Sequence, residues 1–415
     1  MTFMRDMTRH GKFRKSAAAG LTAVLAFSAA PASATTTLTF ATDQGQAFVD
    51  QWQSRLSLCS TQADVQLKPE VSYDFSQKPF IEAASGTPLP DVMLIRPELF
   101  GPIINAGLLE NLQPLIDGTH LDTSAWLPGA VSGTKFNGGT WGLPAYVINY
   151  TYAYNGDLID QAGIAAPGPQ TWVSWDQART IAQKTTKDDN GDGTPDVWGF
   201  VNGTGFVFSL ALMRQAGATI FDEQGLVHFD TAPVKKAVAY LRDMNLEKLH
   251  TSDRSLFWNG KAATERMGSW EHSHITPAVK ASVRTAAGLA DVTKNDIAYD
   301  TSWAISKQSP HVTAAWKFIS CLTSKPVQDQ VIQSGVVPMR RDVTLPADLT
   351  LLQGFMQTLD SSITYPLDPA TTYVVKTFDQ EMADVWTGKK AAENVLGAMD
   401  KAMNAHIVGE HLTVK

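Results

Sequence analysis

The chain has 415 residues, a formal net charge of −7 at pH 7 and only two cysteines. This acidic balance argues against nucleic acid as a partner, because the phosphates require a basic face on the protein. No cluster of cysteine and histidine has the spacing of a zinc site, so a structural zinc ion is not expected either.

Residues 1–34 have the pattern of a cleaved export signal. Five basic residues precede an apolar run over residues 16–30, and residues 31–34 (PASA) end in small residues suited to cleavage. The apolar run is too short for an anchoring transmembrane helix, and no cysteine follows the cleavage site to carry a lipid. We therefore expect a soluble, exported protein that is cleaved near Ala34 and then has a net charge of −11.

The roughly 380 residues that remain exceed what one hydrophobic core usually serves, so two domains are expected. Cys59 and Cys321 are far apart in the sequence. An oxidising compartment permits a disulfide between them, but buried free thiols fit the sequence equally well. His272 and His274 have the spacing of a metal pair on a strand, although a turn after Trp270 is the simpler interpretation.

The first part of the exported chain alternates strand and helix patterns. The predicted strands are residues 36–42, 65–73 and 91–95, and the predicted helices are residues 47–58, 79–85 and 97–106. This order predicts a doubly wound α/β unit, in which ligands lie beyond the carboxyl ends of the strands. Asp43 and Gln44 follow the first strand, and Arg96 and Glu98 follow the third, so all four are candidate site residues.

A long strand is predicted at residues 145–154, after a turn at Asn137-Gly138-Gly139 and the segment 141–144 (WGLP). It is long enough to pass from one domain into another. Beyond it, helices are predicted at residues 171–185 (with Thr171 as the N-cap), 206–216, 234–249, 261–267, 311–322, 325–334, 370–386 and 391–406, with a strand at residues 297–305.

Residues 188–196 (DDNGDGTPD) match the calcium-loop pattern D-x-[DN]-x-[DN]-G. The candidate metal ligands are Asp188, Asn190, Asp192, Thr194 and Asp196. Gly199 replaces the bidentate glutamate of such loops, which weakens the expected dissociation constant to ~10⁻⁴ to 10⁻³ M. A metal-free acidic turn closed by its own hydrogen bonds is the alternative. No cofactor is required, and at most a weakly bound Ca²⁺ is expected.

The sequence lacks the motifs of serine hydrolases, zinc proteases, P-loops and dinucleotide-binding folds. The adjacent acids Asp222 and Glu223 do not by themselves place two carboxylates across a sugar. Trp141, Trp270 and Trp303 lie in polar, turn-like contexts, where indole faces can stack on sugar rings while polar neighbours bind the hydroxyls. A mostly apolar pocket with a few placed polar groups is the general form of a small-molecule site.

Six segments carry a resemblance to a known family, and they occur in the family's order. They are residues 138–144 with 151–158 (G-x-x-W-G-L-P, then TYAYNGDL), 169–177, 188–200, 257–270, 303–324 and 338–343. The chain thereby resembles the extracellular solute-binding proteins of sugar-importing ABC transporters, the class that includes maltodextrin-binding protein. Trp141 in place of the usual Tyr and Thr264 in place of the usual Met depart from the family pattern.

The resemblance implies an α/β fold of the type II periplasmic-binding-protein kind, with two lobes that close around a ligand by hinge motion. In such a fold each lobe is a sheet flanked by helices, and the chain crosses between the lobes several times. The implied N-terminal lobe is 35–145 plus 300–341, and the C-terminal lobe is 146–299 plus 342–415. The stretch of residues 141–154 corresponds to the first crossover, the strand at residues 297–303 to the return, and residues 340–344 to a third crossing.

The resemblance also assigns site residues by their positions in the chain. The candidate ligand-binding residues are Asp43, Gln44, Arg96, Glu98, Tyr146, Phe206, Phe208, Trp270, Glu271, Trp303, Arg340 and Tyr373. Trp270 corresponds to the family's main stacking tryptophan. Glu271 is not part of the family pattern and is expected to tune specificity.

The resemblance implies a non-catalytic periplasmic receptor, a monomer that captures a sugar or oligosaccharide and delivers it to the permease of an ABC importer in the inner membrane. Two alternatives stay open. One is a secreted carbohydrate-active enzyme that uses an acidic pair in the cleft. The other is the same clamp with a different solute, such as a polyamine, a phosphorylated polyol or a metal chelate, since Asp43, Glu98 and Glu271 would suit a cation.

Overall fold

The computed structural model describes residues 35–127, 130–131, 133–136, 138–333, 336–346, 349–359, 362–363 and 370–413. The predicted export signal and Asn137 of the predicted turn lie outside the described residues. The helices and strands all belong to the unit Thr36–Lys415.

The predicted alternation of strands and helices at the start of the chain is confirmed. The elements are β1 (Thr36–Thr42), α1 (Gly45–Ala63), β2 (Val65–Glu70), α2 (Lys78–Ser85), β3 (Val92–Ile95) and α3 (Pro97–Asn105). β1 lies between β2 and β3, and both pairings are parallel. All four residues of β3 are buried, as expected for an uninterrupted apolar strand inside a parallel sheet.

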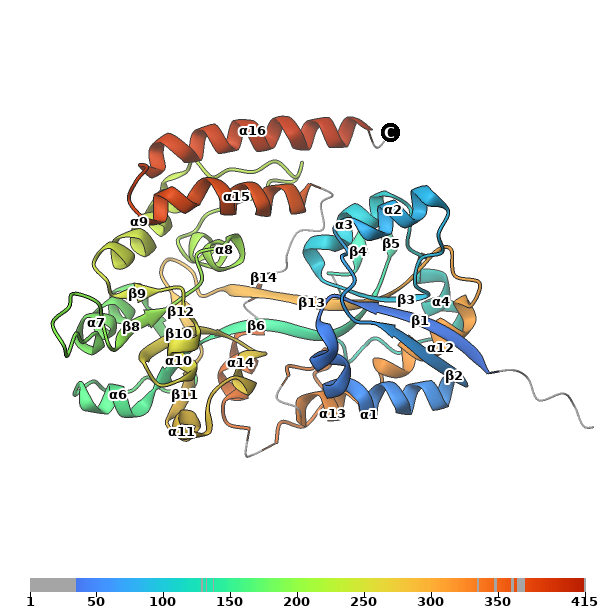
Figure 1. The fold of residues 1–415 in the computed structure, drawn as a ribbon, viewed down its shortest axis with the longest axis horizontal. Coiled ribbons are helices and arrows are strands. Elements are labelled where there is room, and N and C mark those ends of the chain that lie inside the picture. Colours follow the sequence, from blue (N-terminus) through green and yellow to red (C-terminus); the bar gives the residue numbers. More distant parts are fainter. Residues whose placement is uncertain are drawn as a thin grey trace, which may run out of the picture. The chain divides into compact units, whose positions relative to one another are not determined.

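Two long strands, β6 (Leu143–Asn155) and β13 (Asp296–Ile305), lie side by side and continue this sheet into the rest of the chain (Figure 1). β13 pairs with β3 and with β6, both antiparallel. β6 pairs with β13 through residues 143–149 and with β10 (Ala262–Gly268) through residues 150–154. The predicted long strand is thus confirmed, and it connects the two groups of strands.

The second group of strands surrounds the far half of β6. Its members are β8 (Trp198–Val201) and β9 (His250–Thr251), which continue the sheet from β10, and β11 (Val283–Ala286), which pairs with β6. The shorter strands are β4 (Lys135–Phe136), β5 (Gly139–Thr140), β7 (Trp172–Ser174), β12 (Gly288–Ala290) and β14 (Ser362–Ile363).

Helices pack around both groups of strands. They are α4 (Gln113–Thr119), α6 (Gly156–Gln161), α7 (Trp175–Thr185), α8 (Phe206–Gln215), α9 (Ala232–Leu246), α10 (Ser255–Trp258), the 3-10 turn η1 (Glu271–Ser273), α11 (Pro277–Lys280), α12 (Val312–Leu322), α13 (Lys325–Gln333), α14 (Leu352–Thr358), α15 (Thr371–Trp386) and α16 (Ala392–Thr413). The turn expected after Trp270 is therefore present as η1.

Two of the predicted elements are wrong. Residues 261–267, predicted as a helix, form strand β10, because β6 and β8 pair with it on its two sides. Thr171 is not the N-cap of α7, because the following residues form β7, which pairs with β12. Ser174 caps α7 instead, in a reciprocal capping box with Gln177.

Cys59 of α1 and Cys321 of α12 form a disulfide between residues 262 apart in the sequence. The sequence left this pairing open, because it contains no information on whether the two helices are neighbours. The described part of the chain has no free cysteine.

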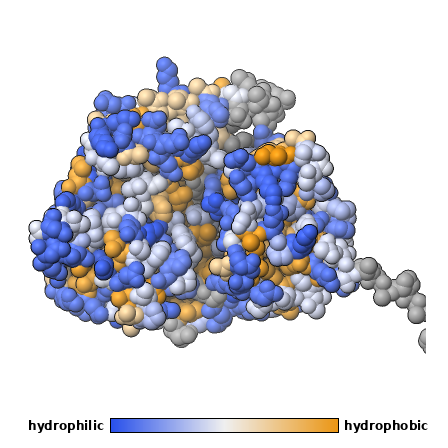
Figure 2. Space-filling model, in the orientation of Figure 1, coloured by the Kyte–Doolittle hydropathy of each residue, from blue (hydrophilic) through white to orange (hydrophobic). Residues whose placement is uncertain are grey.

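The face drawn in Figure 2 is largely hydrophilic, with hydrophobic residues scattered among polar ones. Among the residues that the structure describes, each helix is too short or too polar to cross a membrane.

Candidate ligand-binding site

One part of the candidate site lies at the carboxyl ends of β1 and β3, where Arg96 bridges two acids. Its Nε lies 2.8 Å from Asp43 Oδ2, and its Nη1 lies 2.6 Å from Glu98 Oε1. Burial raises the pKa of Glu98, and the Arg96 charge opposes that rise. The Arg96 side chain is 45% exposed, so its free N–H groups can reach a bound molecule. Asp43 Oδ1 is buried and has no hydrogen-bond partner.

Gln44 and Tyr146 extend this polar part towards β6. The Tyr146 hydroxyl donates to Gln44 Oε1 at 2.7 Å, and its ring packs 5.7 Å from the buried Trp52. Burial raises the pKa of Tyr146 to about 12, so the phenol stays neutral. Thr372 of α15, which was not predicted, donates from Oγ1 to the Glu98 carbonyl oxygen at 2.6 Å.

The second part consists of three aromatic rings. Tyr150 of β6 contacts Phe208 with ring centres 5.6 Å apart and Trp270 with ring centres 5.5 Å apart, both edge to face. The Tyr150 ring is buried, whereas Phe208 and Trp270 are only partly buried. Tyr150 therefore supports two rings that keep some exposed surface for stacking.

Both of the partly exposed rings lie directly over a glycine. A Cβ atom added to Gly268 would meet the Trp270 indole at 2.1 Å, and one added to Gly203 would meet the Phe208 ring at 2.2 Å. Neither glycine was predicted as a site residue. The glycines admit the rings because they lack a side chain.

Tyr299 of β13 lies between the two parts. Tyr299 contributes to the pKa of Tyr150 in one part and to the pKa of Arg96 in the other, so it is close to both. The polar residues that follow β1 and β3 and the rings around β6 and β10 therefore form one candidate site.

The structure brings together most of the predicted ligand-binding residues. Those in the two parts are Asp43, Gln44, Arg96, Glu98, Tyr146, Phe208 and Trp270. Glu271 is buried behind Trp270 and pairs with Arg254, a residue that sequence reasoning missed. Arg254 follows no recognisable motif, and one of its two acidic partners, Glu265, lies in a segment that was predicted as a helix.

Two predicted aromatic residues lie in hydrophobic cores. Trp303 is fully buried and packs against Phe40 and Trp52. Phe206 is 1% exposed and packs against other phenylalanines of the second core. Phe206 and Phe208 differ in this way because residues two apart on a helix face different directions.

Two further predicted residues have partners elsewhere. Arg340 forms an ion pair with Asp342 at 2.8 Å. Tyr373 of α15 stacks on His406 of α16 with ring centres 3.8 Å apart. Neither contact joins these residues to the two parts of the site.

The calcium-like loop is closed by its own hydrogen bonds. The Asp188 carboxylate accepts from the backbone N–H groups of Gly191 and Gly193, each at 2.7 Å, and Asp196 accepts from Asp189 at 2.8 Å. In the described part of the chain no three His, Cys, Asp or Glu side chains are grouped so that they could hold a metal ion. Weak Ca²⁺ binding here stays a prediction.

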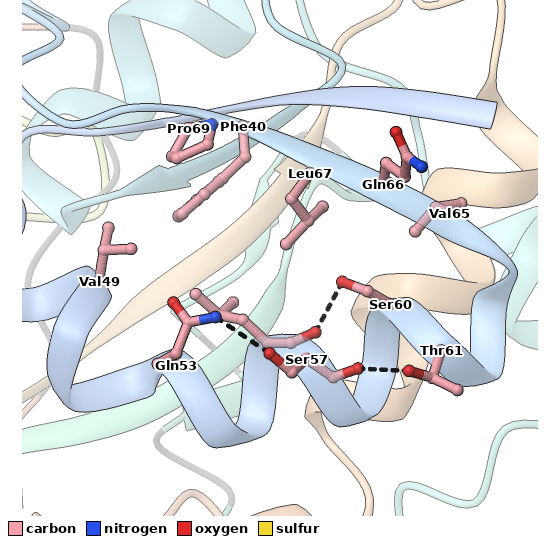
Figure 3. Close-up of a pocket in the computed structure, with 11 residues that line it drawn as sticks. Phe40, Val49, Gln53, Ser57, Ser60, Thr61, Val65, Gln66, Leu67 and Pro69 are labelled. Atoms are coloured by element: carbon pink, nitrogen blue, oxygen red, sulfur yellow. Dashed lines mark hydrogen bonds between the residues drawn. The ribbon is translucent and has the colours of Figure 1, made fainter. Parts of the chain in front are cut away.

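A separate groove of about 480 Å³ lies between α1 and β2 (Figure 3). Its lining residues are Phe40, Val49, Gln53, Leu56, Ser57, Ser60, Thr61, Val65, Gln66, Leu67 and Pro69. None of them is charged, and none is a predicted ligand-binding residue. The groove is therefore distinct from the two-part site.

The fold is that of the two-lobe periplasmic binding proteins, as solved structures of similar architecture show. The chain belongs to the bacterial extracellular solute-binding protein family, whose sequence profile matches residues 61–329.

Individual relatives are distant in sequence. The chain is 24% identical over 292 residues to the arabinooligosaccharide-binding protein of Bacillus subtilis (strain 168), and the match covers 63% of each of the two chains. An ABC substrate-binding protein from Listeria monocytogenes in complex with cycloalternan has a TM-score of 0.78 and 20% identity, covering 90% of this chain and 99% of that chain. Maltose-bound MalE3 of T. maritima has a TM-score of 0.75 and 20% identity, covering 89% and 99%.

Proposed function

We propose that the protein is a receptor that captures a sugar or oligosaccharide at the two-part site and delivers it to the permease of an ABC importer. The observation that carries the proposal is the pairing of two partly exposed rings, Phe208 and Trp270, with the polar group around Arg96. Aromatic faces suit the C–H faces of a sugar, and the charged groups suit its hydroxyls. The relatives described above carry sugars in their names or in their bound ligands.

The charge balance favours a neutral ligand. Asp43 and Glu98 are both paired with Arg96, and Glu271 is paired with Arg254. A polyamine would have to compete with these arginines for the same carboxylates, which disfavours a cationic ligand.

The same pairings disfavour a glycosidase. A general acid must present its carboxyl group to the substrate, and a nucleophile must be free to attack. The acids closest to the rings are held by arginines, so the site is better suited to binding than to hydrolysis.

We further infer that the protein acts in the periplasm as a monomer after loss of residues 1–34. The export and the location rest on the sequence pattern of those residues and on the family's extracellular character.

A thermal-shift screen tests the proposal. It should cover mono-, di- and oligosaccharides, polyols and polyamines. A ligand at a hundred times its dissociation constant stabilises the folded protein by ~2.7 kcal/mol. We expect shifts confined to a few sugars, with no release of reducing ends. Shifts with polyamines alone would contradict the choice of ligand, and turnover of an oligosaccharide would contradict the receptor.

A further inference from the structure

Arg254 lies behind both of the rings that the site offers to a ligand. Its guanidinium carbon is 4.8 Å from the centre of the Phe208 ring and 5.7 Å from the centre of the Trp270 ring. Cation–π contacts at this range are attractive, and they are strongest where water is excluded. The Arg254 side chain is only 15% exposed, so a single cation can restrain both rings.

Two buried acids hold Arg254 in place. Glu265 Oε1 lies 3.1 Å from Arg254 Nε, and Glu271 pairs with Arg254 Nη2. Glu271 also accepts the backbone N–H of Gly268 at 2.9 Å. Gly268 is the glycine over which the Trp270 indole lies, so the same carboxylate ties Arg254 to the backbone beneath that ring.

The two acids share one cation. Glu265 and Glu271 are 0% and 1% exposed, and both carboxyl groups pair with the Arg254 guanidinium. Glu265 Oε2 is buried and has no donor. One arginine cannot neutralise two buried carboxylates, and an unpaired buried charge is costly. A proton on Glu265 removes the excess charge.

Burial and the neighbouring Glu271 charge both raise the pKa of Glu265. The other charged groups nearby do not replace the proton. Arg266 is engaged by Asp296 in a buried ion pair, with Nε 3.1 Å from Oδ2. Burial raises the pKa of Tyr150 to about 12, so its phenol stays neutral.

The remaining titratable neighbour is His272, which directly follows Glu271 in η1. Its Nδ1 lies 3.2 Å from the Ser269 carbonyl oxygen and therefore donates to it.

We propose that Arg254, held between Glu265 and Glu271, is a positioning residue that fixes Trp270 and Phe208 for stacking on the ligand. This inference rests on the proposed function only in taking the stacked ligand to be a sugar. Trp270 and Phe208 are the groups that stack on the ligand, and Arg254 affects ligand binding through these two rings.

The test compares Arg254→Met and Arg254→Lys with a matched control, Arg179→Met, which removes the ion pair with Glu247 outside the site. The first readout needs no ligand. It is the acrylamide quenching of Trp270 emission, obtained as the difference between each protein and the same protein carrying Trp270→Phe. We expect Arg254→Met to raise the quenching constant of Trp270, because the indole is no longer restrained.

The second readout is calorimetric affinity for arabinotriose and maltotriose. We expect Arg254→Met to lower the affinity on the order of tenfold or more, as for the loss of a desolvated cation–π contact. Arg179→Met should leave the affinity unchanged. Arg254→Lys should lie between them, because lysine keeps the charge but not the planar fork that holds two carboxylates.

The pH dependence of the affinity and of the Trp270 quenching distinguishes a positioning role of Arg254 from simple packing. The folded-state pKa of Glu265 is raised, so the fold gains stability from the proton at low pH and loses that stability as the pH rises above the usual glutamate range. Glu265→Gln replaces the protonated carboxyl group by a neutral amide of the same shape. We expect this variant to match the wild type in affinity and Trp270 quenching at low pH, and to remove the pH dependence that the wild type shows on alkalinisation.

The proposal is overturned if Arg254→Met leaves both the quenching constant and the affinities within twofold of the wild type. It is also overturned if Glu265→Gln keeps the wild-type pH profile. If circular dichroism shows that Arg254→Met is unfolded, the same measurements on Arg254→Lys and Glu265→Gln decide whether Arg254 is a positioning residue. If the wild type binds neither sugar, the proposed ligand class fails, while the quenching and pH measurements still decide the role of Arg254.

Discussion

Gly268→Ala should weaken ligand binding much more than it weakens the fold. The new Cβ would lie 2.1 Å from the Trp270 indole, whereas ordinary contacts begin near 3.4 Å, so one of the two must move by roughly 1.3 Å. Gly268 is fixed in the fully buried strand β10, whereas the indole is partly exposed, and the ring is therefore the part that moves. Such overpacking costs about 1–3 kcal/mol of stability. Displacing a central stacking residue costs about 2 kcal/mol of binding, close to a 30-fold rise in Kd.

Calorimetry with the best sugar from the screen, together with thermal unfolding, measures both effects. Gly118→Ala is the matched control, because a Cβ at Gly118 meets nothing within 4 Å and lies in helix α4. We expect the control to keep the wild-type affinity and to lose no stability. A Gly268→Ala protein that binds the sugar within threefold of the wild type would refute the reasoning, because the indole would then tolerate displacement.

Three further predictions follow from other parts of the structure. Replacing both Cys59 and Cys321 by serine should lower the free energy of unfolding by about 3 kcal/mol in urea titrations, since the disulfide closes a very long loop; equal midpoints for the two proteins would contradict this. Burial raises the pKa of Asp300 to about 7, so the wild type should lose stability as the pH rises through 7, whereas Asp300→Asn should not; parallel pH profiles would show that Asp300 does not titrate there. The loop that begins at Asp188 should bind Ca²⁺ no more tightly than ~10⁻⁴ M by calorimetry, because it lacks the bidentate glutamate, and a micromolar site would show that another ligand replaces it.

The sequence predicted the order of elements at the start of the chain because there the local signals and the fold agree. The apolar run before Arg96 is a buried parallel strand, and polar residues that follow such strands meet at one edge of the sheet. Asp43, Arg96 and Glu98 could be predicted for this reason.

β10 could not be predicted, because its residues favour the wrong element. Two alanines, Glu265, Arg266 and Met267 form helices readily, yet here they pair with strands on both sides. The pairing buries two ionisable side chains, Glu265 and Arg266, and their partners, Arg254 and Asp296, lie elsewhere in the chain. The support behind Trp270 depends on those long-range pairs, so no local pattern could indicate it.

Trp303 is a second case in which local sequence led to a wrong prediction. It follows the polar Ser302, which suggested an exposed ring at the cleft. Alternation along β13 instead turns the indole into a core, where it packs against Phe40 and Trp52. The face of the sheet to which a strand residue points depends on the register of the strand, and the sequence alone did not determine that register.

The most direct test of the account is a sugar titration of the wild type and of Trp270→Ala, with Trp172→Phe as the control outside the site. We predict that the wild type binds an oligosaccharide without hydrolysing it. We also predict that Trp270→Ala weakens binding by about 30-fold or more while the control keeps the wild-type affinity. Equal affinity for the wild type and Trp270→Ala would show that the sugar binds elsewhere, and would contradict the assignment of this site.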